Sequence, residues 1–180
     1  MEIFEHLSLG FSVAFTMQNL LYAFVGCFLG TLIGVLPGVG PVAVRVDASQ
    51  SHAGLAFSNC QMMAGIEVGE TNRGPVKFSN CGFWGIPATD HHAQIAGSGT
   101  VIFTSCHFQG WARKNPDAPC IVAREGRLIV NGCAFLDENK RHILLESGVR
   151  SASIFGNQFT GGAKIENQSP GHVEMGLNIE

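Results

Sequence analysis

Apolar and polar residues alternate in short segments that return at regular intervals through the last three quarters of the chain. In one of them, Val76 and Phe78 alternate with polar residues, and Cys81 and Phe83 form a second alternating pair that is one residue out of phase. Alternation with a period of two predicts a strand with one buried face, and the change of phase predicts a corner between two such strands. Equivalent segments span residues 55–62, 76–83, 101–108, 128–135 and 152–159.

The corner position carries residue types that mostly tolerate a left-handed backbone. The five residues there are Asn59, Asn80, Ser105, Gly132 and Gly156. The next position holds Cys in the first four copies and Asn157 in the fifth, and it recurs after 21, 25, 27 and 24 residues. A second apolar segment precedes each of the last four copies, at residues 66–68, 94–96, 121–123 and 143–145, and a further such segment, 164–166, follows the fifth copy. Repeats of this length indicate a solenoid.

The pattern therefore predicts an all-β chain that folds as a right-handed parallel β-helix of about five coils. Successive coils in such a fold stack about 4.8 Å apart, and each buries its inward face against its neighbours. The predicted inner stacks are Phe57, Phe78, Phe103, Val130 and Ile154, and Met62, Phe83, Phe108, Phe135 and Phe159. Helical repeats are excluded because no repeat shows apolar residues at helical spacing over ten positions.

The cysteines at the repeat position predict a column of thiols along one inner corner. Cys60, Cys81, Cys106 and Cys133 would lie one above another, where reduced Cys packs as a small apolar side chain. A tetrahedral zinc site needs ligands that converge on one point, which a linear column does not provide. Adjacent histidines such as His91 and His92 would face opposite ways on a strand. We therefore predict no metal site and no cofactor.

The first part of the chain has a different composition. Residues 7–44 contain no Asp, Glu, Lys or Arg, and the most apolar part, residues 20–36, has the length of a membrane crossing. We predict one transmembrane helix in residues 1–43, a junction at 44–53 and the β-helix at 54–180. A secretory signal peptide is the alternative, although the positive region that precedes such peptides is missing. The expected location is a membrane, with contact through residues 7–43.

The Gly- and Pro-rich end of this apolar segment adds a resemblance. The run from Gly30 to Pro41, together with Leu9-Gly10-Phe11 and residues 18–22, is similar to the amino terminus of the large membrane subunit of the tripartite tricarboxylate transporters. The resemblance implies a bacterial inner-membrane location and an unwound loop near a substrate site. The loop residues would be Gly34, Pro37, Gly38, Gly40 and Pro41. It covers only about 43 residues, and one helix cannot provide alternating access, so this chain alone is not expected to transport.

The last coils suggest a second resemblance. Residues 54–180 resemble the final coils of pectate-lyase-like right-handed β-helix proteins, many of which act on polysaccharides, and the resemblance is carried by the stretch from residues 142–149 through 164–167. The match concerns the fold, and a fold does not determine a function. The Asn-Thr-Asp and Asp-Asp motifs of polygalacturonase-like enzymes are absent, so no catalytic residue is transferred.

Loops that follow the repeated segment carry the candidate catalytic carboxylates. The candidates are Asp90, Asp117, Asp137 and Glu138, which would lie along one side of the solenoid. Glycoside hydrolysis needs two carboxyl groups about 5 to 9.5 Å apart, and residues one or two coils apart could meet that distance. A lyase would instead need a base such as Lys140 beside a carboxylate-bound Ca²⁺. The simpler interpretation is that these are solvated loop residues.

Two tryptophans in the same loops favour binding over cleavage. Trp84 and Trp111 could offer aromatic faces to sugar rings, or could pack beneath the loops. We predict a membrane-anchored β-helix module that binds carbohydrate or is structural. The alternatives are a fragment of a polysaccharide-degrading hydrolase or lyase and a truncated transporter subunit. The near-neutral charge does not indicate nucleic acid, and the unpaired edge of the first coil predicts self-association.

Overall fold

The computed structural model describes residues 6, 10–35, 42–47 and 54–180. These fall into two compact units, divided between Pro37 and Gly38. The first unit contains helix α2 (Met17–Val35), which includes Gly34 of the transporter-like run. The other four residues of that predicted loop, Pro37, Gly38, Gly40 and Pro41, lie outside the described residues.

The predicted transmembrane helix is not supported. Within the described ranges, no helix combines the length and the apolar character that a bilayer crossing requires. Polar amides occupy the start of α2, where Gln18 donates to the Tyr22 hydroxyl and Asn19 donates to the Val13 carbonyl.

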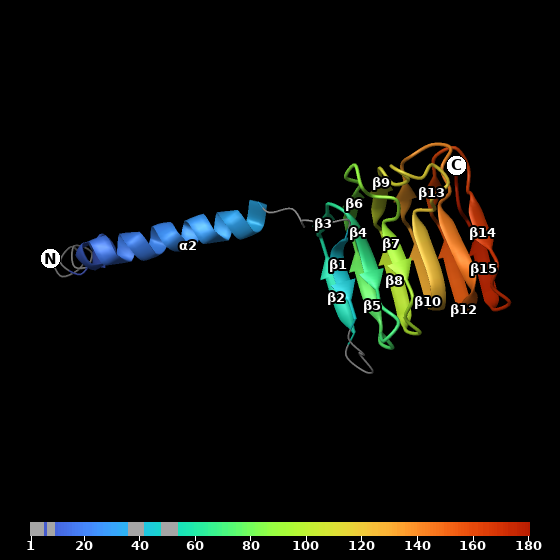
Figure 1. Cartoon of the computed structure of the whole chain (residues 1–180), viewed down its shortest axis with the longest axis horizontal. Coiled ribbons are helices and arrows are strands. Elements are labelled where there is room, and N and C mark those ends of the chain that lie inside the picture. The colour runs from blue at the N-terminus through green and yellow to red at the C-terminus, as the bar shows by residue number, and fades with distance from the viewer. Residues whose placement is uncertain (1–5, 7–9, 36–41, 48–53) are drawn as a thin grey trace. The chain divides into compact units, whose positions relative to one another are not determined.

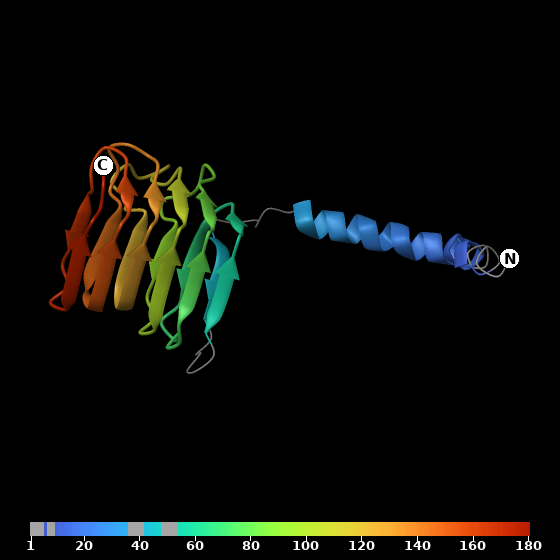
Figure 2. The same ribbon diagram turned by 180° about the vertical axis from the view of Figure 1, so that it is seen from behind.

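The second unit is a parallel β-solenoid of about five turns (Figures 1 and 2). Each turn passes through three strand positions, and every strand pairs in parallel with its equivalents in the neighbouring turns. The first face comprises β1 (Val42–Val46), β4 (Gly65–Val68), β7 (Ala93–Ile95), the start of β10 (Ile121–Asn131), the start of β12 (Ile143–Phe155) and β14 (Ile165–Asn167). The second face comprises β2 (Leu55–Ser58), β5 (Val76–Ser79), β8 (Thr100–Thr104), the ends of β10 and β12, and β15 (His172–Gly176).

The third face is a separate sheet. It comprises β3 (Gln61–Met62), β6 (Gly82–Trp84), β9 (His107–Gln109), β11 (Ala134–Phe135) and β13 (Gln158–Phe159). The first two faces form one ten-stranded sheet, because β10 and β12 run through both of them without a break. The predicted parallel solenoid is thus confirmed, and its right-handedness stays a prediction.

The stacking register agrees with the sequence pattern. Phe57, Phe78, Phe103, Val130 and Ile154 are aligned across the second face, and Met62, Phe83, Phe108, Phe135 and Phe159 across the third. Ring centroids in the third-face stack lie 4.8 Å apart from Phe83 to Phe108, from Phe108 to Phe135 and from Phe135 to Phe159. Because this spacing equals that of the strands, the rings stack face to face without distortion of the backbone.

The predicted corners are also confirmed. Asn59, Asn80, Ser105, Gly132 and Gly156 all have φ between 52° and 64°. This left-handed conformation costs Asn and Gly little, and it turns the chain from the second face to the third. Leu177 has a φ of 54° and repeats the corner once more beyond the last copy recognised in the sequence.

Cysteine and asparagine side chains line the inside of this corner, and side chains of both types donate hydrogen bonds to carbonyls of the preceding turn. The Cys81 thiol donates to the Phe57 carbonyl at 3.5 Å and the Cys106 thiol to the Phe78 carbonyl at 3.4 Å. Asn157 Nδ2 makes the equivalent bond to Val130 at 3.0 Å, and Asn178 Nδ2 to Ile154 at 3.1 Å. Each side chain therefore ties its own turn to the preceding one.

Replacement of Asn157 by Ala is expected to lower the free energy of unfolding by about 2 to 3 kcal/mol. Asn157 is fully buried, and its Oδ1 also accepts a hydrogen bond from the Cys133 backbone at 2.9 Å. The substitution would leave a buried donor and a buried acceptor without partners. Urea denaturation measures the loss, and Asn131→Ala, at an exposed position of β10, serves as the control. Equal stability of the two variants would contradict this role.

The solenoid begins earlier in the chain than predicted. Residues 42–46 form β1, which pairs with β4, so the segment assigned to a junction at 44–53 contains part of the first strand. At the other end, β15 pairs with β12 and was not recognised. Neither strand lies between two copies of the repeated pattern, because β1 precedes the first copy and β15 follows the last one.

Candidate functional site

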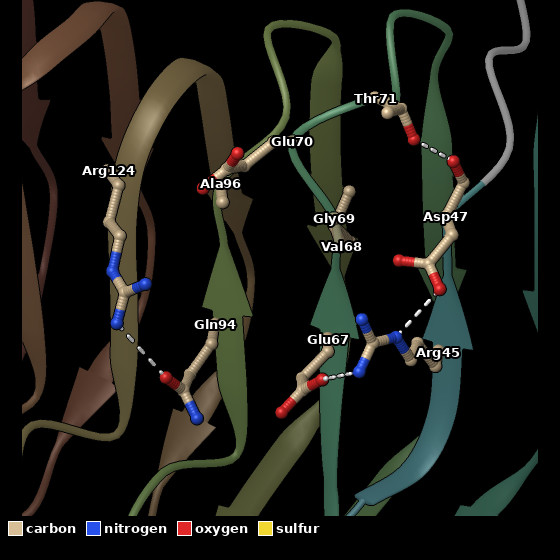
Figure 3. Close-up of a pocket in the computed structure, with 10 residues that line it drawn as sticks. All are labelled: Arg45, Asp47, Glu67, Val68, Gly69, Glu70, Thr71, Gln94, Ala96 and Arg124. Atoms are coloured by element: carbon tan, nitrogen blue, oxygen red, sulfur yellow. Dashed lines mark hydrogen bonds and ion pairs between the residues drawn. The ribbon is translucent and has the colours of Figure 1, made fainter.

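An open groove lies on the outer side of the first face. It has a volume of about 430 Å³ and is lined by side chains from β1, β4, β7 and β10 and from the turns that follow them. The polar lining residues are Arg45, Asp47, Glu67, Glu70, Thr71, Gln94 and Arg124 (Figure 3). The volume falls within the range typical of small-ligand sites.

Strand register brings the central polar residues together. Arg45 lies beside Glu67, and Glu67 beside Gln94, as directly paired positions of β1, β4 and β7. They point outward because the neighbouring residues Val46, Val68 and Ile95 occupy the buried face. The alternation that builds the core therefore also places a row of polar side chains across successive turns.

Ion pairs hold this row in place. Arg45 Nε lies 2.7 Å from Asp47 Oδ2, and its Nη1 lies 3.3 Å from Glu67 Oε2. The hydrogen bond with Asp47 raises the pKa of Arg45, so the guanidinium remains charged. At the opposite wall, Arg124 donates to Gln94 Oε1 at 3.3 Å and lies 3.8 Å from Glu146. Exposed pairs of this kind add little stability, but they fix the directions in which the groove offers donors and acceptors.

Glycines allow the turns beside the groove to pack closely. A Cβ at Gly69 would lie 2.3 Å from Asp47 Oδ1, and a Cβ at Gly97 would lie 2.7 Å from the Asn72 carbonyl. The Thr71 hydroxyl also donates to the Asp47 carbonyl. The turns that follow β1, β4 and β7 therefore pack closely, and the polar side chains stand above a compact backbone.

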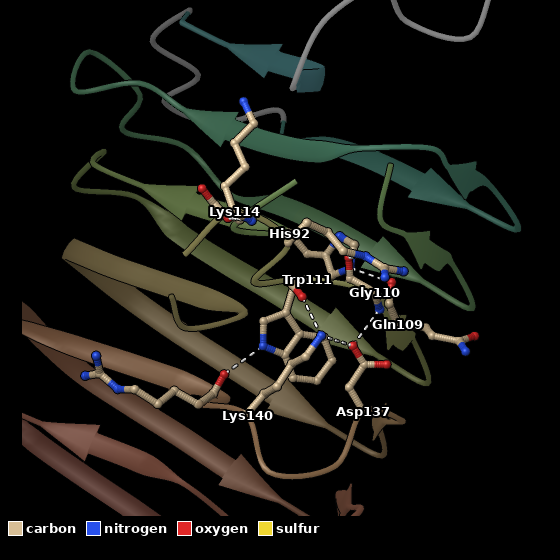
Figure 4. A network of polar contacts seen from close by, with 10 residues as sticks. His92, Gln109, Gly110, Trp111, Lys114, Asp137 and Lys140 are labelled. Carbon is tan, nitrogen blue, oxygen red and sulfur yellow. Dashed lines mark hydrogen bonds and ion pairs between the residues drawn. The ribbon is translucent and has the colours of Figure 1, made fainter. Parts of the chain in front are cut away.

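The loops that carry the predicted catalytic residues form a different network. Asp137 Oδ2 accepts hydrogen bonds from the Gly110 backbone at 2.9 Å and from Lys140 Nζ at 2.7 Å. Lys140 Nζ also donates to the Trp111 carbonyl at 2.6 Å and lies 5.4 Å from the centre of the indole (Figure 4). Asp137 therefore connects the loops of two successive turns.

The other candidate carboxylates are placed as follows. Asp90 Oδ1 accepts from the backbone N–H groups of Asn115 and Lys114, and these bonds lower the pKa of Asp90. Asp117 and Glu138 are exposed. Asp90 and Asp137 thus connect neighbouring loops, and a catalytic role for any of the four carboxylates stays a prediction.

The two tryptophans have different surroundings. Trp111 is fully buried and donates from Nε1 to the Arg141 carbonyl at 2.9 Å. The Trp111 ring therefore offers no face to a sugar, and the expectation of an open platform at Trp111 is wrong. The loop that carries Lys140 covers the ring, and Lys140 Nζ lies over it. Trp84 is 39% exposed, donates to Gln61 Oε1 at 2.6 Å and lies edge-on to His107. Sugar binding at Trp84 stays a prediction.

Two buried histidines lie beneath the same loops. His92 Nε2 is 2.9 Å from the Gln109 carbonyl, and the Lys164 backbone donates to His142 Nδ1 at 3.0 Å. Both rings contact Trp111. Burial lowers the pKa of each to about 4, so both are neutral at pH 7.

Comparisons with protein families, with curated proteins and with solved structures find no match for this chain. These comparisons support neither the transporter resemblance nor the pectate-lyase resemblance. The structure supports the solenoid fold alone. The groove residues were not among the predicted site residues. The paired, outward-facing residues of the groove are 22 or more positions apart in the sequence, so no short sequence motif marks the groove.

Proposed function

We propose that the solenoid is a non-catalytic binding module for a short, uncharged carbohydrate chain, held in the groove of the first face. The observation that carries the proposal is the row of paired residues Arg45, Glu67 and Gln94 on β1, β4 and β7, which Arg124 of β10 joins through its hydrogen bond to Gln94. A row that crosses the turns suits an extended ligand that lies along the solenoid axis.

The chemistry of the lining favours hydroxyl groups. The groove offers guanidinium donors, carboxylate acceptors and an amide that does both. A sugar hydroxyl both donates and accepts hydrogen bonds, so it can pair with each of these groups. Two arginines and three acidic residues nearly balance in charge, which gives no strong attraction for either a cationic or an anionic ligand.

The same pairs argue against hydrolysis in this groove. A glycosidase needs one neutral carboxylic acid beside a second carboxylate. Asp47 and Glu67 are both paired with the guanidinium of Arg45, so neither carboxyl group is free to face a leaving group. The arrangement supports recognition of hydroxyl groups and does not support proton donation to a leaving group.

Isothermal titration calorimetry of the full chain with cellotetraose and with tetragalacturonate tests the proposal. We expect cellotetraose to bind and Arg124→Ala to weaken its binding about tenfold, because a hydrogen bond to a charged group is lost. Arg127→Ala is the matched control, since Arg127 is exposed on the same strand and lies outside the groove.

Three results would overturn the proposal. The first is no heat from cellotetraose at millimolar concentration. The second is equal weakening by Arg124→Ala and by the Arg127→Ala control. The third is tighter binding of tetragalacturonate, which would show that the groove selects acidic sugars.

A further inference from the structure

The two ends of the solenoid present strands that are paired on one side only. Among the described strands, β1 pairs only with β4 and β2 only with β5, and we call their free edges the first-turn end. Strands β14 and β15 each pair only with β12, and their free edges form the last-turn end (Figure 1). An edge strand offers a row of N–H and C=O groups to any strand that lies beside it.

Apolar side chains of the inner stack are exposed at the last-turn end. Met175 of β15 is aligned with Ile154 of β12, so it continues the second-face stack. Ile154 is fully buried, whereas Met175 is 48% exposed, and Leu177 and Ile179 at the same end are 86% and 62% exposed. A further turn stacked on β15 would cover these side chains in the way that neighbouring turns cover one another inside the solenoid.

The hydrogen bonds of the corners also call for a further turn. At each of the five earlier corners, the backbone N–H donates to a carbonyl of the next turn at 2.9 to 3.1 Å. The acceptor is the residue before the next corner, as in the bonds from Asn59 to Ser79 and from Gly156 to Gly176. Leu177 has the same left-handed backbone, with φ 54°, but the described part of the chain holds no acceptor of this kind for its N–H.

The first turn of a second copy has the geometry that the last-turn end requires. Parallel pairing is continuous from β1 to β14 and from β2 to β15, so each pair of end strands occupies the same position in its turn. In that register Phe57, which is only partly buried in its own chain, would cover Met175. The carbonyl of Ser58, the residue before the first corner, would accept the N–H of Leu177.

Charged side chains at the two ends are complementary in the same register. Arg45 of β1 and Glu166 of β14 occupy the same outward position, which the strand pairs connect from turn to turn. Their side chains are 64% and 46% exposed. Stacking of opposite ends would place this carboxylate beside this guanidinium. Two last-turn ends would instead bring Glu166 and Glu174 of both copies together, and like charges at an interface are unfavourable.

We propose that this chain associates head to tail, with the first-turn end of one copy stacked on the last-turn end of the next. The contact continues the solenoid through pairing of β14 with β1 and of β15 with β2 of the second copy. The two surfaces differ, so the contact does not close on itself and further copies are added in a line.

Sedimentation velocity of the full chain over a range of concentrations tests the contact. We expect the wild-type sedimentation coefficient to rise with concentration, and Ala56→Pro and Met175→Lys each to weaken association at least about tenfold, because Pro and Lys block strand edges. Leu55 and Asn59 donate to the next turn, so the intervening Ala56 N–H points to the free edge of β2 and its loss spares the bonds to β5. Leu136→Lys is the matched control, since Leu136 is 41% exposed in an interior turn. Circular dichroism establishes that each variant is folded.

An equimolar mixture of the two edge variants distinguishes opposite ends from like ends. Each variant keeps one intact end, so the mixture should form a species of two chains that neither variant forms alone. The proposal is overturned by a wild-type chain that stays a single species at every concentration, by equal weakening in Leu136→Lys, by undiminished association of either edge variant alone, or by no recovery in the mixture. The experiment contains no carbohydrate and changes no groove residue, so its outcome is separate from that of the binding proposal.

Discussion

Acidification from pH 7 to pH 4 is expected to lower the free energy of unfolding by up to about 3 kcal/mol for each of two buried histidines. His92 and His142 have a pKa of about 4 in the folded chain because burial disfavours the charged ring. In the unfolded chain their pKa returns to about 6.5. The unfolded state therefore binds more protons between these values, and stability is full above pH 6.5 and falls as the pH approaches 4.

Nearby charges do not remove this effect. Asp137 raises the pKa of both histidines, whereas Lys140 lowers that of His92 and Lys164 lowers that of His142. Burial is the largest cause in each case. The free energy of unfolding should thus fall between pH 6.5 and 4. Backbone hydrogen bonds lower the pKa of Asp90, so its protonation becomes important only below this range.

Urea denaturation at several pH values measures this dependence. His92→Gln and His142→Gln are each expected to reduce the slope of stability against pH, since a side chain that does not titrate replaces the ring. His172→Gln is the control, because His172 is exposed beside Glu174. A slope that is unchanged in both core variants would show that other groups govern acid unfolding.

Replacement of Phe108 by Ala is expected to lower the free energy of unfolding by about 4 kcal/mol. Its ring lies 4.8 Å from the rings of both Phe83 and Phe135 and is fully buried, so truncation opens a cavity in the middle of the third-face stack. The same change at Phe57 should cost clearly less. Phe57 lies in the first turn, is only partly buried and stacks on one ring, that of Phe78, at 5.0 Å.

Chemical denaturation of the two variants measures this difference. If the rings support one another across turns, Phe108→Ala lowers the free energy of unfolding more than Phe57→Ala does. Losses of equal size would mean that the rings do not support one another across turns, and the stacked core would then be an inadequate description.

The sequence predicted the core because the core is built from local repetition. Alternation set the inward residues, and the change of phase at residues such as Asn80 marked the corners, whose positive φ values agree. Strand β1 was missed because it precedes the first copy of the repeat, with no copy on its amino-terminal side. The burial of Trp111 was not predictable from the pattern either, since it depends on Lys140 and Arg141 of the next turn.

The groove was less predictable for a related reason. Arg45 and Glu67 meet only when two turns are stacked in register, and neither residue stands out from ordinary surface charges along the chain. Candidate carboxylates were therefore sought in the irregular loops, where polar residues collect. In the structure, Asp90 and Asp137 of those loops bind backbone groups of the neighbouring loop.

The register of the turns is the central claim, and nuclear Overhauser spectroscopy on a chain with labelled phenylalanine tests it most directly. The solenoid predicts cross-peaks from Phe83 to Phe108, from Phe108 to Phe135 and from Phe135 to Phe159, whose ring centroids lie 4.8 Å apart. Cross-peaks that join Phe83 directly to Phe159, or the absence of contacts between Phe108 and both of its stacked neighbours, would contradict it.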